Sequence, residues 1–387
     1  DAQKKVYAAV DQQITEWGVE HNANGWRADA YLYCLETECP ECGVDVPLAP
    51  SWVIGKRTNT IARLELNEDE GRFDIHIDQG VSKADLKQAD EAGTVQGDRL
   101  HCPACGRQTP MKMIRGDQRS GNSTTYGLRM WTNDDIAPRP GDTFQERLYC
   151  VRWVETYTDD DSEEKTRRHY RSVTEGDRER EDKILRLLEE RFDDWQEKGY
   201  IPSRRIEPGD KTDEPIRTRG WAYWHHLFNP RQLLIHGLFL EAAEEKFGAN
   251  TLPKAGTLLG VGRCGDWSSK LARWDRSYAN EKAAQTFSNQ ALNTLYNYAL
   301  RPLTVLKSTW RLEFPSYAVP GKKKIEACDA RRVDQNCDFW ITDPPYADAI
   351  NYHELSEFFL AWYEKPLQDL FPEWYTDSKR ALAVTGD

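Results

Sequence analysis

Hydrophobic positions at the start of the chain have helical spacing, and the pattern then changes to alternation. In "KKVYAAVDQQITEWGVEHN" the apolar side chains recur every three or four residues, which predicts one amphipathic helix. The next segment, "DAYLYCLETECPECG", alternates like a strand and ends in a pair of cysteines. Between Cys42 and Cys102, "ARLELNED" and "RFDIHID" alternate as well, with polar residues between them. This pattern predicts short antiparallel strands.

A shift to strongly charged sequence marks residues 158–207, where charges of both signs are mixed. The later part of this segment keeps apolar residues at helical spacing, which predicts a solvated amphipathic helix. These residues are Ile184, Leu185, Leu187, Leu188, Phe192 and Trp195.

Two further helices are predicted after the charged segment. The aromatic-rich "GWAYWHHLFNPRQLL" leads into the first, with Asn229 as its N-cap and Pro230 at the first helical position. The second is "AQTFSNQALNTLYNYAL". His225 and His226 lie among Trp221, Tyr223 and Trp224, and aromatic packing is favoured over metal binding because no third ligand has a fitting spacing.

Near the end of the chain, "KKKIEACDARRVDQNCDFWITDPPY" contains two short apolar runs that each end in an acid. The order of strand, acid, loop, strand and turn is typical of an α/β sheet. In such sheets ligands gather beyond the carboxyl ends of the strands.

Composition places the chain among globular proteins, with 387 residues of which 39% are hydrophobic and 30% charged. It has no apolar run long enough to span a membrane, and no signal peptide precedes "DAQKKVYAAV", so we expect a cytoplasmic protein. The formal charge of -12 argues against non-specific coating of nucleic acid. A local basic groove remains compatible with that charge.

Two near-identical knuckles carry the clearest chemical signal. Cys39 and Cys42 lie in "CPECG", and Cys102 and Cys105 lie in "CPACG". Each knuckle brings two thiolates to one side of a metal ion, so the pair predicts a structural Zn2+ site with four cysteine ligands. The alternative is redox-active or merely buried cysteines, which the duplication disfavours. Four thiolates saturate zinc, so this site would serve as scaffold or in DNA contact, without a catalytic role.

The other cysteines have no partner spacing. The strand pattern places Cys34 in the sheet, and we expect the remaining four to be small core residues. These are Cys150, Cys264, Cys328 and Cys337.

A basic patch accompanies the second knuckle in "HCPACGRQTPMKMIRGDQR". It is interpreted either as a contact to a nucleic-acid backbone or as a solvated loop. Its members are Arg107, Lys112, Arg115 and Arg119.

The Asp-Pro-Pro-Tyr turn suits an enzyme that methylates the exocyclic amine of a base. The amine is a poor nucleophile until acceptors hold its two hydrogens. Asp343 offers a carboxylate and Pro344 a carbonyl, while the paired prolines fix the backbone and leave no competing N–H group. Tyr346 is placed to stack on a base taken out of the duplex.

"ITDPPY" resembles the catalytic motif of amino-methylating DNA methyltransferases that use S-adenosylmethionine. The wider pattern resembles the adenine-specific DNA methylases that contain a zinc ribbon. The segments that carry this resemblance are "CPECG", "CPACG", "GWAYWHHLFNPRQLL", "QTFSNQAL", "CDARRVDQNCDFWITDPPYAD" and "NYHELSEFFLAWY".

The resemblance implies that Asp343, Pro344, Pro345 and Tyr346 are catalytic and that Asp329 binds the adenine end of S-adenosyl-L-methionine. A solvated loop acid is the alternative for Asp329. The residues after the motif either line the base pocket or simply begin a helix. These are Asp348, Asn351 and Tyr352.

One part of the family pattern is missing. The glycine-rich loop that cradles the methionine part of the cofactor is not found, and "LLGVGRCGD" at 258–266 is a weak candidate because helical segments flank it. In the resembled family this loop lies upstream of the knuckles. We therefore expect the chain to be a fragment, with an incomplete nucleotide-binding sheet and weak or absent activity.

The expected fold is α/β, a partial Rossmann-like methyltransferase sheet with an inserted zinc-ribbon β-subdomain and a helical region. The expected division is 1–33 leading into the insertion, 34–150 as the zinc-ribbon subdomain, 151–310 as the mainly helical region, and 311–387 as the Rossmann-like part.

The expected function is methyl transfer from S-adenosyl-L-methionine to the N6 amine of a flipped adenine in DNA. The alternatives are cytosine-N4 methylation and a non-catalytic zinc-ribbon subunit that binds DNA or assembles with others. Expected partners are DNA and other subunits of a defence or modification system, and no membrane.

Overall fold

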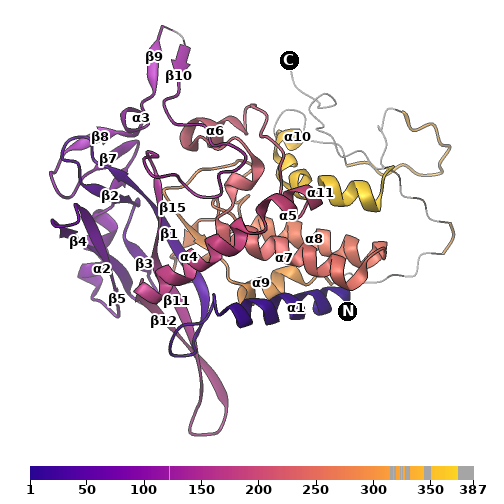
Figure 1. Cartoon of the computed structure of the whole chain (residues 1–387), viewed down its shortest axis with the longest axis horizontal. Helices are drawn as coiled ribbons and strands as arrows, with labels where there is room; N and C mark the ends of the chain where they lie inside the picture. Colours follow the sequence, from indigo (N-terminus) through magenta and orange to yellow (C-terminus); the bar gives the residue numbers. More distant parts are fainter. Residues whose placement is uncertain are drawn as a thin grey trace.

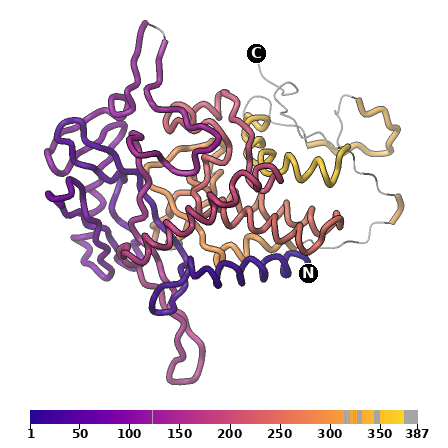
Figure 2. Tube along the Cα trace, in the orientation of Figure 1, coloured from indigo at the N-terminus to yellow at the C-terminus, as the bar shows by residue number. Residues whose placement is uncertain are grey.

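A computed structural model describes residues 1–121, 123–313, 317, 320–322, 324, 326, 332–343 and 350–373. A β-rich part lies beside a helical part, and two hairpins project from opposite sides of the β-rich part (Figures 1 and 2). The α/β class, the helical region and the cluster of four cysteines are therefore confirmed.

The main sheet has eight strands in the order β12-β11-β1-β2-β5-β4-β3, with β15 also paired to β1. β2 and β5 pair in parallel, and the other described strands of this sheet pair antiparallel. The strands are β1 (Arg27–Glu38), β2 (Asp45–Leu48), β3 (Val53–Gly55), β4 (Thr60–Asn67), β5 (Arg72–Gln79), β11 (Gln145–Thr158), β12 (Glu164–Ser172) and β15 (Asn297–Leu300).

β1 is the central strand of this sheet, and all its residues between the two ends are buried. Two of those residues are acids, and each is matched by two arginines. Asp29 pairs with Arg152 and Arg168, and Glu36 pairs with Arg72 and Arg147. These ion pairs allow the two carboxylates to be buried, because an unpaired buried charge lowers the stability of the fold by about 3–5 kcal/mol.

Smaller elements complete the β-rich part. A three-stranded sheet, β6-β7-β8, follows helix α2, and a separate two-stranded hairpin, β9-β10, follows α3. Their bounds are α2 (Lys83–Glu91), β6 (Val95–Gln96), β7 (Arg99–His101), β8 (Gln108–Pro110), α3 (Met111–Ile114), β9 (Gln118–Ser120), β10 (Ser123–Thr125), β13 (Trp274–Asp275) and β14 (Lys282–Ala283).

Helix α7 (Pro230–Phe247) is the centre of the helical part. Asn229 caps it as predicted, accepting a hydrogen bond from the Arg231 N–H at 3.0 Å, while the Gln232 side chain accepts from the Asn229 N–H at 2.9 Å. α7 is buried on all sides for most of its length because it contacts α1, α4 and α8. The surrounding elements are α1 (Ala2–Trp17), α4 (Glu175–Glu189), α5 (Phe192–Lys198), α6 (Asp213–Arg219), η1 (Trp224–Leu227), α8 (Thr251–Trp267), α9 (Leu303–Trp310), α10 (Tyr352–Leu355) and α11 (Glu357–Leu370).

The later part of the charged segment forms a helix as predicted, α4, and its first part lies in the β11-β12 hairpin. Two sequence-based expectations were wrong in their local structure. The stretch 284–300 is irregular and ends in β15, because Tyr298 and its neighbours pair with β1. The strand expected ahead of Asp343 is not formed: residues 333–343 have no helix or strand, and no described strand pairs with them.

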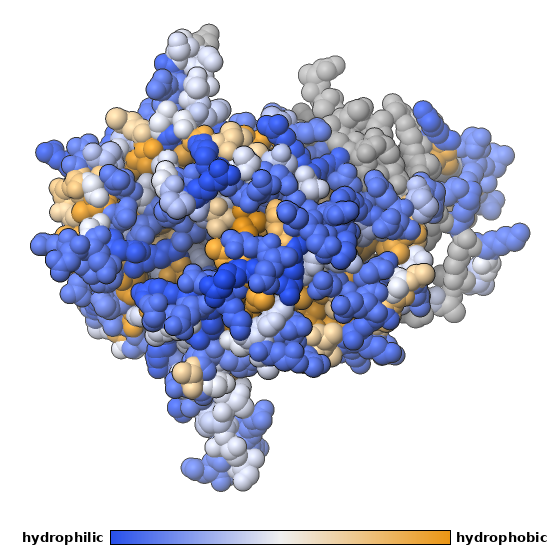
Figure 3. All heavy atoms as spheres, in the orientation of Figure 1, coloured by the Kyte–Doolittle hydropathy of each residue, from blue (hydrophilic) through white to orange (hydrophobic). Residues whose placement is uncertain are grey.

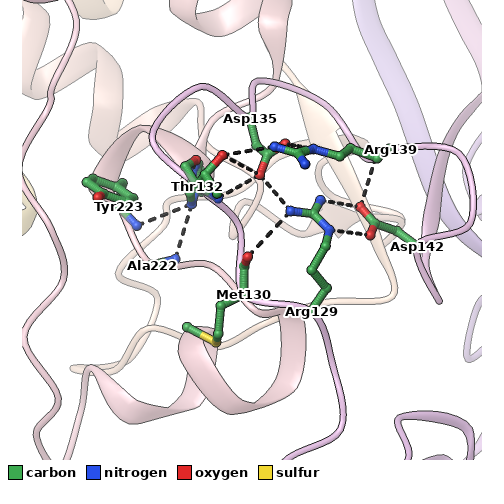
Figure 4. A network of polar contacts seen from close by, with 9 residues as sticks. Arg129, Met130, Thr132, Asp135, Arg139, Asp142, Ala222 and Tyr223 are labelled. Carbon is green, nitrogen blue, oxygen red and sulfur yellow. Dashed lines mark hydrogen bonds and ion pairs between the residues drawn. The ribbon is translucent and has the colours of Figure 1, made fainter.

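A polar network joins the two parts of the molecule (Figure 4). Arg129 makes two hydrogen bonds to the carboxylate of Asp142, at 2.6 and 2.7 Å, and one to Asp135 at 2.7 Å. His226 accepts from two backbone N–H groups with Nδ1 and lies 2.9 Å from the Thr132 carbonyl with Nε2. These contacts fix the linker 129–142 to the segment around η1.

His236 lies fully buried on α7 between Phe228 and Trp362, and neither ring nitrogen has a hydrogen-bond partner among the described residues. Burial lowers the pKa of His236 to about 3. In the unfolded chain the ring takes up a proton below about pH 6.5. The folded state does not, so stability is lost as the pH falls below that value.

We therefore predict that His236→Leu weakens the acid sensitivity of the protein. Between about pH 7 and pH 5 the variant should lose about 2 kcal/mol less unfolding free energy than the parent. Urea unfolding at the two pH values measures this difference. Phe228→Leu changes the same cluster without removing a titrating ring, so an equal effect from it would refute the explanation.

Candidate metal centre and the methylation motif

The four predicted zinc ligands meet at one point. Cys39 and Cys42 lie on the turn between β1 and β2, and Cys102 and Cys105 on the turn between β7 and β8. In the first turn the Cys39 carbonyl accepts the Gly43 N–H at 2.8 Å, and in the second the Cys102 carbonyl accepts the Gly106 N–H at 2.9 Å. Gly43 and Gly106 have φ of 74° and 70°, which explains the glycine after each knuckle.

The sulfur geometry fits a tetrahedral ion. All four sulfurs lie within 4.8 Å of one another. Cys39 Sγ is 3.9 Å from Cys105 Sγ, and Cys42 Sγ is 3.7 Å from Cys102 Sγ. Zinc bound to four thiolates at about 2.3 Å has sulfurs about 3.8 Å apart. The cluster can therefore hold a metal such as zinc.

Protonation of the thiols depends on their position in the turn. Burial raises the pKa of Cys39 and raises that of Cys102 to about 12. The backbone N–H of Arg107 lowers the pKa of the exposed Cys105. Because zinc binds thiolates, loading the site at neutral pH must release protons from Cys39 and Cys102.

A small apolar cluster lies under the knuckles and is separate from the other cores. Few side chains fill it, so a metal crosslink would supply stability that burial alone does not. Its members include Leu35, Val46, Leu48, Phe73, Val95, Leu100 and Met111.

Asp343 is the one member of the Asp-Pro-Pro-Tyr motif among the described residues, and its side chain is exposed. Pro344, Pro345 and Tyr346 lie outside the described residues, as do Asp329 and Asp348. On the amino-terminal side of Asp343, three consecutive apolar side chains face solvent: Phe339 is 88% exposed, Trp340 58% and Ile341 97%.

On the carboxyl side of the motif the chain is firmly attached to the helical part. Asn351 takes the N-cap position of α10, and Tyr352 is 46% exposed. α11 continues from α10 and buries Phe358 and Trp362.

Glu354 on α10 was not recognised as important from the sequence. Its buried carboxylate accepts the backbone N–H groups of Asp210, Lys211 and Thr212 at 3.1, 2.8 and 3.2 Å. The carboxylate thereby ties the loop before α6 to the helix that follows the motif. The available signal was that Glu354 and Glu357 lie one helical turn apart on the apolar face of "HELSEFFLAW".

The weak cofactor-loop candidate at 258–266 is helical, since it lies inside α8. Its glycines are explained by packing. A Cβ on Gly260 would lie 2.7 Å from the Trp310 ring, and one on Gly262 would lie 1.7 Å from the Tyr363 hydroxyl oxygen. Close helix packing therefore accounts for these glycines.

One of the four residues of the basic patch forms an ion pair. Arg115 pairs with Asp117 at 2.8 Å, whereas the other three members are exposed. His225 and His226 are buried among aromatic rings, as predicted.

Of the remaining cysteines, Cys34 lies in β1 of the sheet, and Cys150 and Cys264 are buried, all as predicted. The prediction for Cys337 was wrong, because this residue lies in the exposed segment ahead of Asp343. Cys328 lies outside the described residues.

Comparison of the chain with protein-family models, curated proteins and solved structures found no match. Among the residues that the structure describes, no helix combines the length and the apolar character needed to cross a membrane.

We predict about one zinc ion per chain, bound by the four knuckle cysteines. Cys39→Ser should reduce the zinc content to less than about one tenth of stoichiometric, measured by elemental analysis after dialysis. Zinc affinity should also fall with decreasing pH, because protons compete for the thiolates.

Cys337→Ser is the matched control, since this cysteine is exposed and lies far from the knuckles in sequence. Full zinc content in Cys39→Ser, or equal loss in both variants, would contradict the proposed ligand set.

Proposed function

We propose that this protein is a DNA methyltransferase that transfers a methyl group from S-adenosyl-L-methionine to the N6 amine of an adenine. The observation that carries the proposal is the Asp-Pro-Pro-Tyr sequence at 343–346, in a chain whose cysteine knuckles form a cluster able to hold zinc. The exposed carboxylate of Asp343 is compatible with access by a flipped base.

In this proposal Asp343 and the carbonyl of Pro344 accept hydrogen bonds from the two hydrogens of the amine. Holding both hydrogens draws the nitrogen toward sp3 geometry and makes its lone pair available for attack. Tyr346 stacks on the face of the base. S-adenosyl-L-methionine would supply an electrophilic methyl group, and breaking its S–CH3 bond would leave S-adenosylhomocysteine. The methylated nitrogen would lose a proton to Asp343 or water, and no covalent enzyme intermediate is needed.

The firm attachment of the carboxyl side of the motif supports a positioning role. Residues 350–370 are held by the buried carboxylate of Glu354 and by the packing of Phe358 and Trp362. A hydrogen-bond acceptor that must meet one amine benefits from such a fixed support, because misplacement by about 1 Å can cost about a hundredfold in rate.

In this proposal Asp329 contacts the adenosine of the cofactor.

We predict that Asp343→Ala in the full-length protein lowers the rate of methyl transfer to DNA by at least about a hundredfold, because one of the two acceptors for the amine is lost. Transfer of a labelled methyl group measures the rate. Mass spectrometry of the digested DNA then separates N6-methyladenine from N4-methylcytosine.

Asp338→Ala is the matched control, because this acid is exposed in the same segment and should leave the rate unchanged. Normal methylation by Asp343→Ala would refute the mechanism. If the full-length protein neither binds the cofactor in calorimetry nor methylates DNA, the chain is a non-catalytic subunit.

A further inference from the structure

A narrow two-stranded ribbon, formed by β9 and β10, projects from the β-rich part beside the metal centre (Figure 1). The strands pair antiparallel, with Arg119 opposite Thr124. All residues of both strands are exposed. In the space-filling view this arm carries hydrophilic and intermediate residues, without the hydrophobic patches seen on the body (Figure 3). The side chains of the two strands therefore do not contribute to a hydrophobic core.

The base of the ribbon is held rigidly. Gly116 has φ of 75°, and a Cβ on Gly127 would lie 2.4 Å from the Gly116 carbonyl oxygen, so the two backbones touch. Asp117 accepts hydrogen bonds from Arg115 Nε at 2.9 Å and from the Gly127 N–H at 3.4 Å. Only glycine permits so close an approach. These contacts fix the direction in which the ribbon leaves the body.

The chain that leaves the ribbon is anchored a second time. Arg129 binds Asp135 and Asp142 (Figure 4), and the Trp131 N–H donates to the Gly220 carbonyl at 2.8 Å. The chain that follows the ribbon is thus tied to the helical part at Gly220. An arm fixed at its base and at the segment that follows it can present its side chains in a defined place.

Charge distinguishes this region from the rest of the chain. Residues 99–133 contain one acid, Asp117, although the chain as a whole has a net charge of -12. That acid is paired with Arg115. The cations of the region are Arg99, Arg107, Lys112, Arg115, Arg119 and Arg129.

The second projecting hairpin, β11-β12, differs at its tip, although its strand β12 also carries Lys165, Arg167 and Arg168. Residues 159–164 at its tip contain five acids. The two arms are both exposed, so exposure alone does not explain the absence of acids in β9-β10. A polyanionic partner would be repelled by one arm and accepted by the other.

We propose that the β9-β10 ribbon is a DNA-contacting arm, with Arg119 and the hydroxyl and amide side chains of its strands directed at duplex DNA. A two-stranded ribbon fits the major groove, where such side chains can bond to base edges and phosphates. Arg107 and Lys112, exposed near the base of the ribbon, contact the phosphate backbone. The choice of DNA as the polyanion rests on the proposed function.

The test uses the full-length, zinc-loaded protein and a fluorescent mixed-sequence duplex of about 30 base pairs, with binding followed by anisotropy over a range of salt concentrations. Arg119→Glu should weaken binding about tenfold at about 100 mM salt and reduce the salt slope by about one. Replacing residues 118–125 by a short Gly-Ser linker should weaken binding at least as much.

Lys165→Glu is the matched control, because it makes the same charge reversal on the other projecting hairpin. It should leave the affinity unchanged. Arg119 is exposed and lies outside the apolar clusters, so zinc content and circular dichroism of the variant should equal those of the parent.

Unchanged affinity and salt slope in Arg119→Glu, or an equal loss in Lys165→Glu, would overturn the assignment of this ribbon. If the protein methylates DNA while Arg119→Glu binds normally, the arm is wrong and the proposed function stands. If Arg119→Glu weakens DNA binding but the parent transfers no methyl group, the arm stands and the proposed function is wrong. Failure of the parent to bind the duplex overturns both.

Discussion

The β-rich part depends on the meeting of two cysteine turns, since Cys42 and Cys102 are separated by 60 residues in the chain yet have their sulfurs 3.7 Å apart. Among the described strands, the small sheet β6-β7-β8 forms no ladder with the main sheet. Two contacts link them: the Val95 N–H donates to the Ala49 carbonyl at 3.1 Å, and the buried Thr94 hydroxyl donates to the Pro47 carbonyl at 2.6 Å and accepts the Ala49 N–H at 3.0 Å. A metal ion would add a further link at the cysteine turns. It would also fix the register of β1, on which β2, β11 and β15 all pair.

Buried ion pairs join that sheet to the helices. The side chain of Lys270 has no exposed surface, and its ammonium lies 2.5 Å from the Glu146 carboxylate on β11. The same ammonium lies 4.9 Å from the ring centroid of Trp131 and 5.0 Å from that of Trp221. Burial lowers the pKa of Lys270, while Glu146 opposes that shift. Removing either partner would leave a buried charge uncompensated, at a cost of about 3–5 kcal/mol. The pair therefore specifies how the β-rich and helical parts dock.

Local signals in the sequence were sufficient for much of this fold. The CxxC spacing identified the four cysteines that meet in a cluster able to hold a metal, Asn229 and Pro230 marked the start of α7, and alternation identified the hairpin of β4 and β5. The failures depend on distant partners. Residues 284–300 have helix-like apolar spacing, but Tyr298 is used to pair with β1 and to hydrogen-bond Glu146. The spacing of Glu354 and Glu357 could have suggested a buried acid, but its partners could not be predicted, because they lie in a loop more than 140 residues earlier.

Glu354 also shows how the motif is related to the rest of the chain. The Glu354 carboxylate accepts three consecutive backbone N–H groups, which replace the water that would otherwise solvate both partners. Hydrogen bonds of this kind specify one arrangement of the loop and α10, whereas apolar packing would tolerate several. The arrangement places the loop 210–212 against α10, and only residues 344–350 separate α10's N-cap, Asn351, from Asp343. The amino-terminal side of Asp343 has no comparable contact among the described residues, since Phe339 and Ile341 face solvent. Among the described residues, the contacts that support the motif therefore come from the helical part on its carboxyl side.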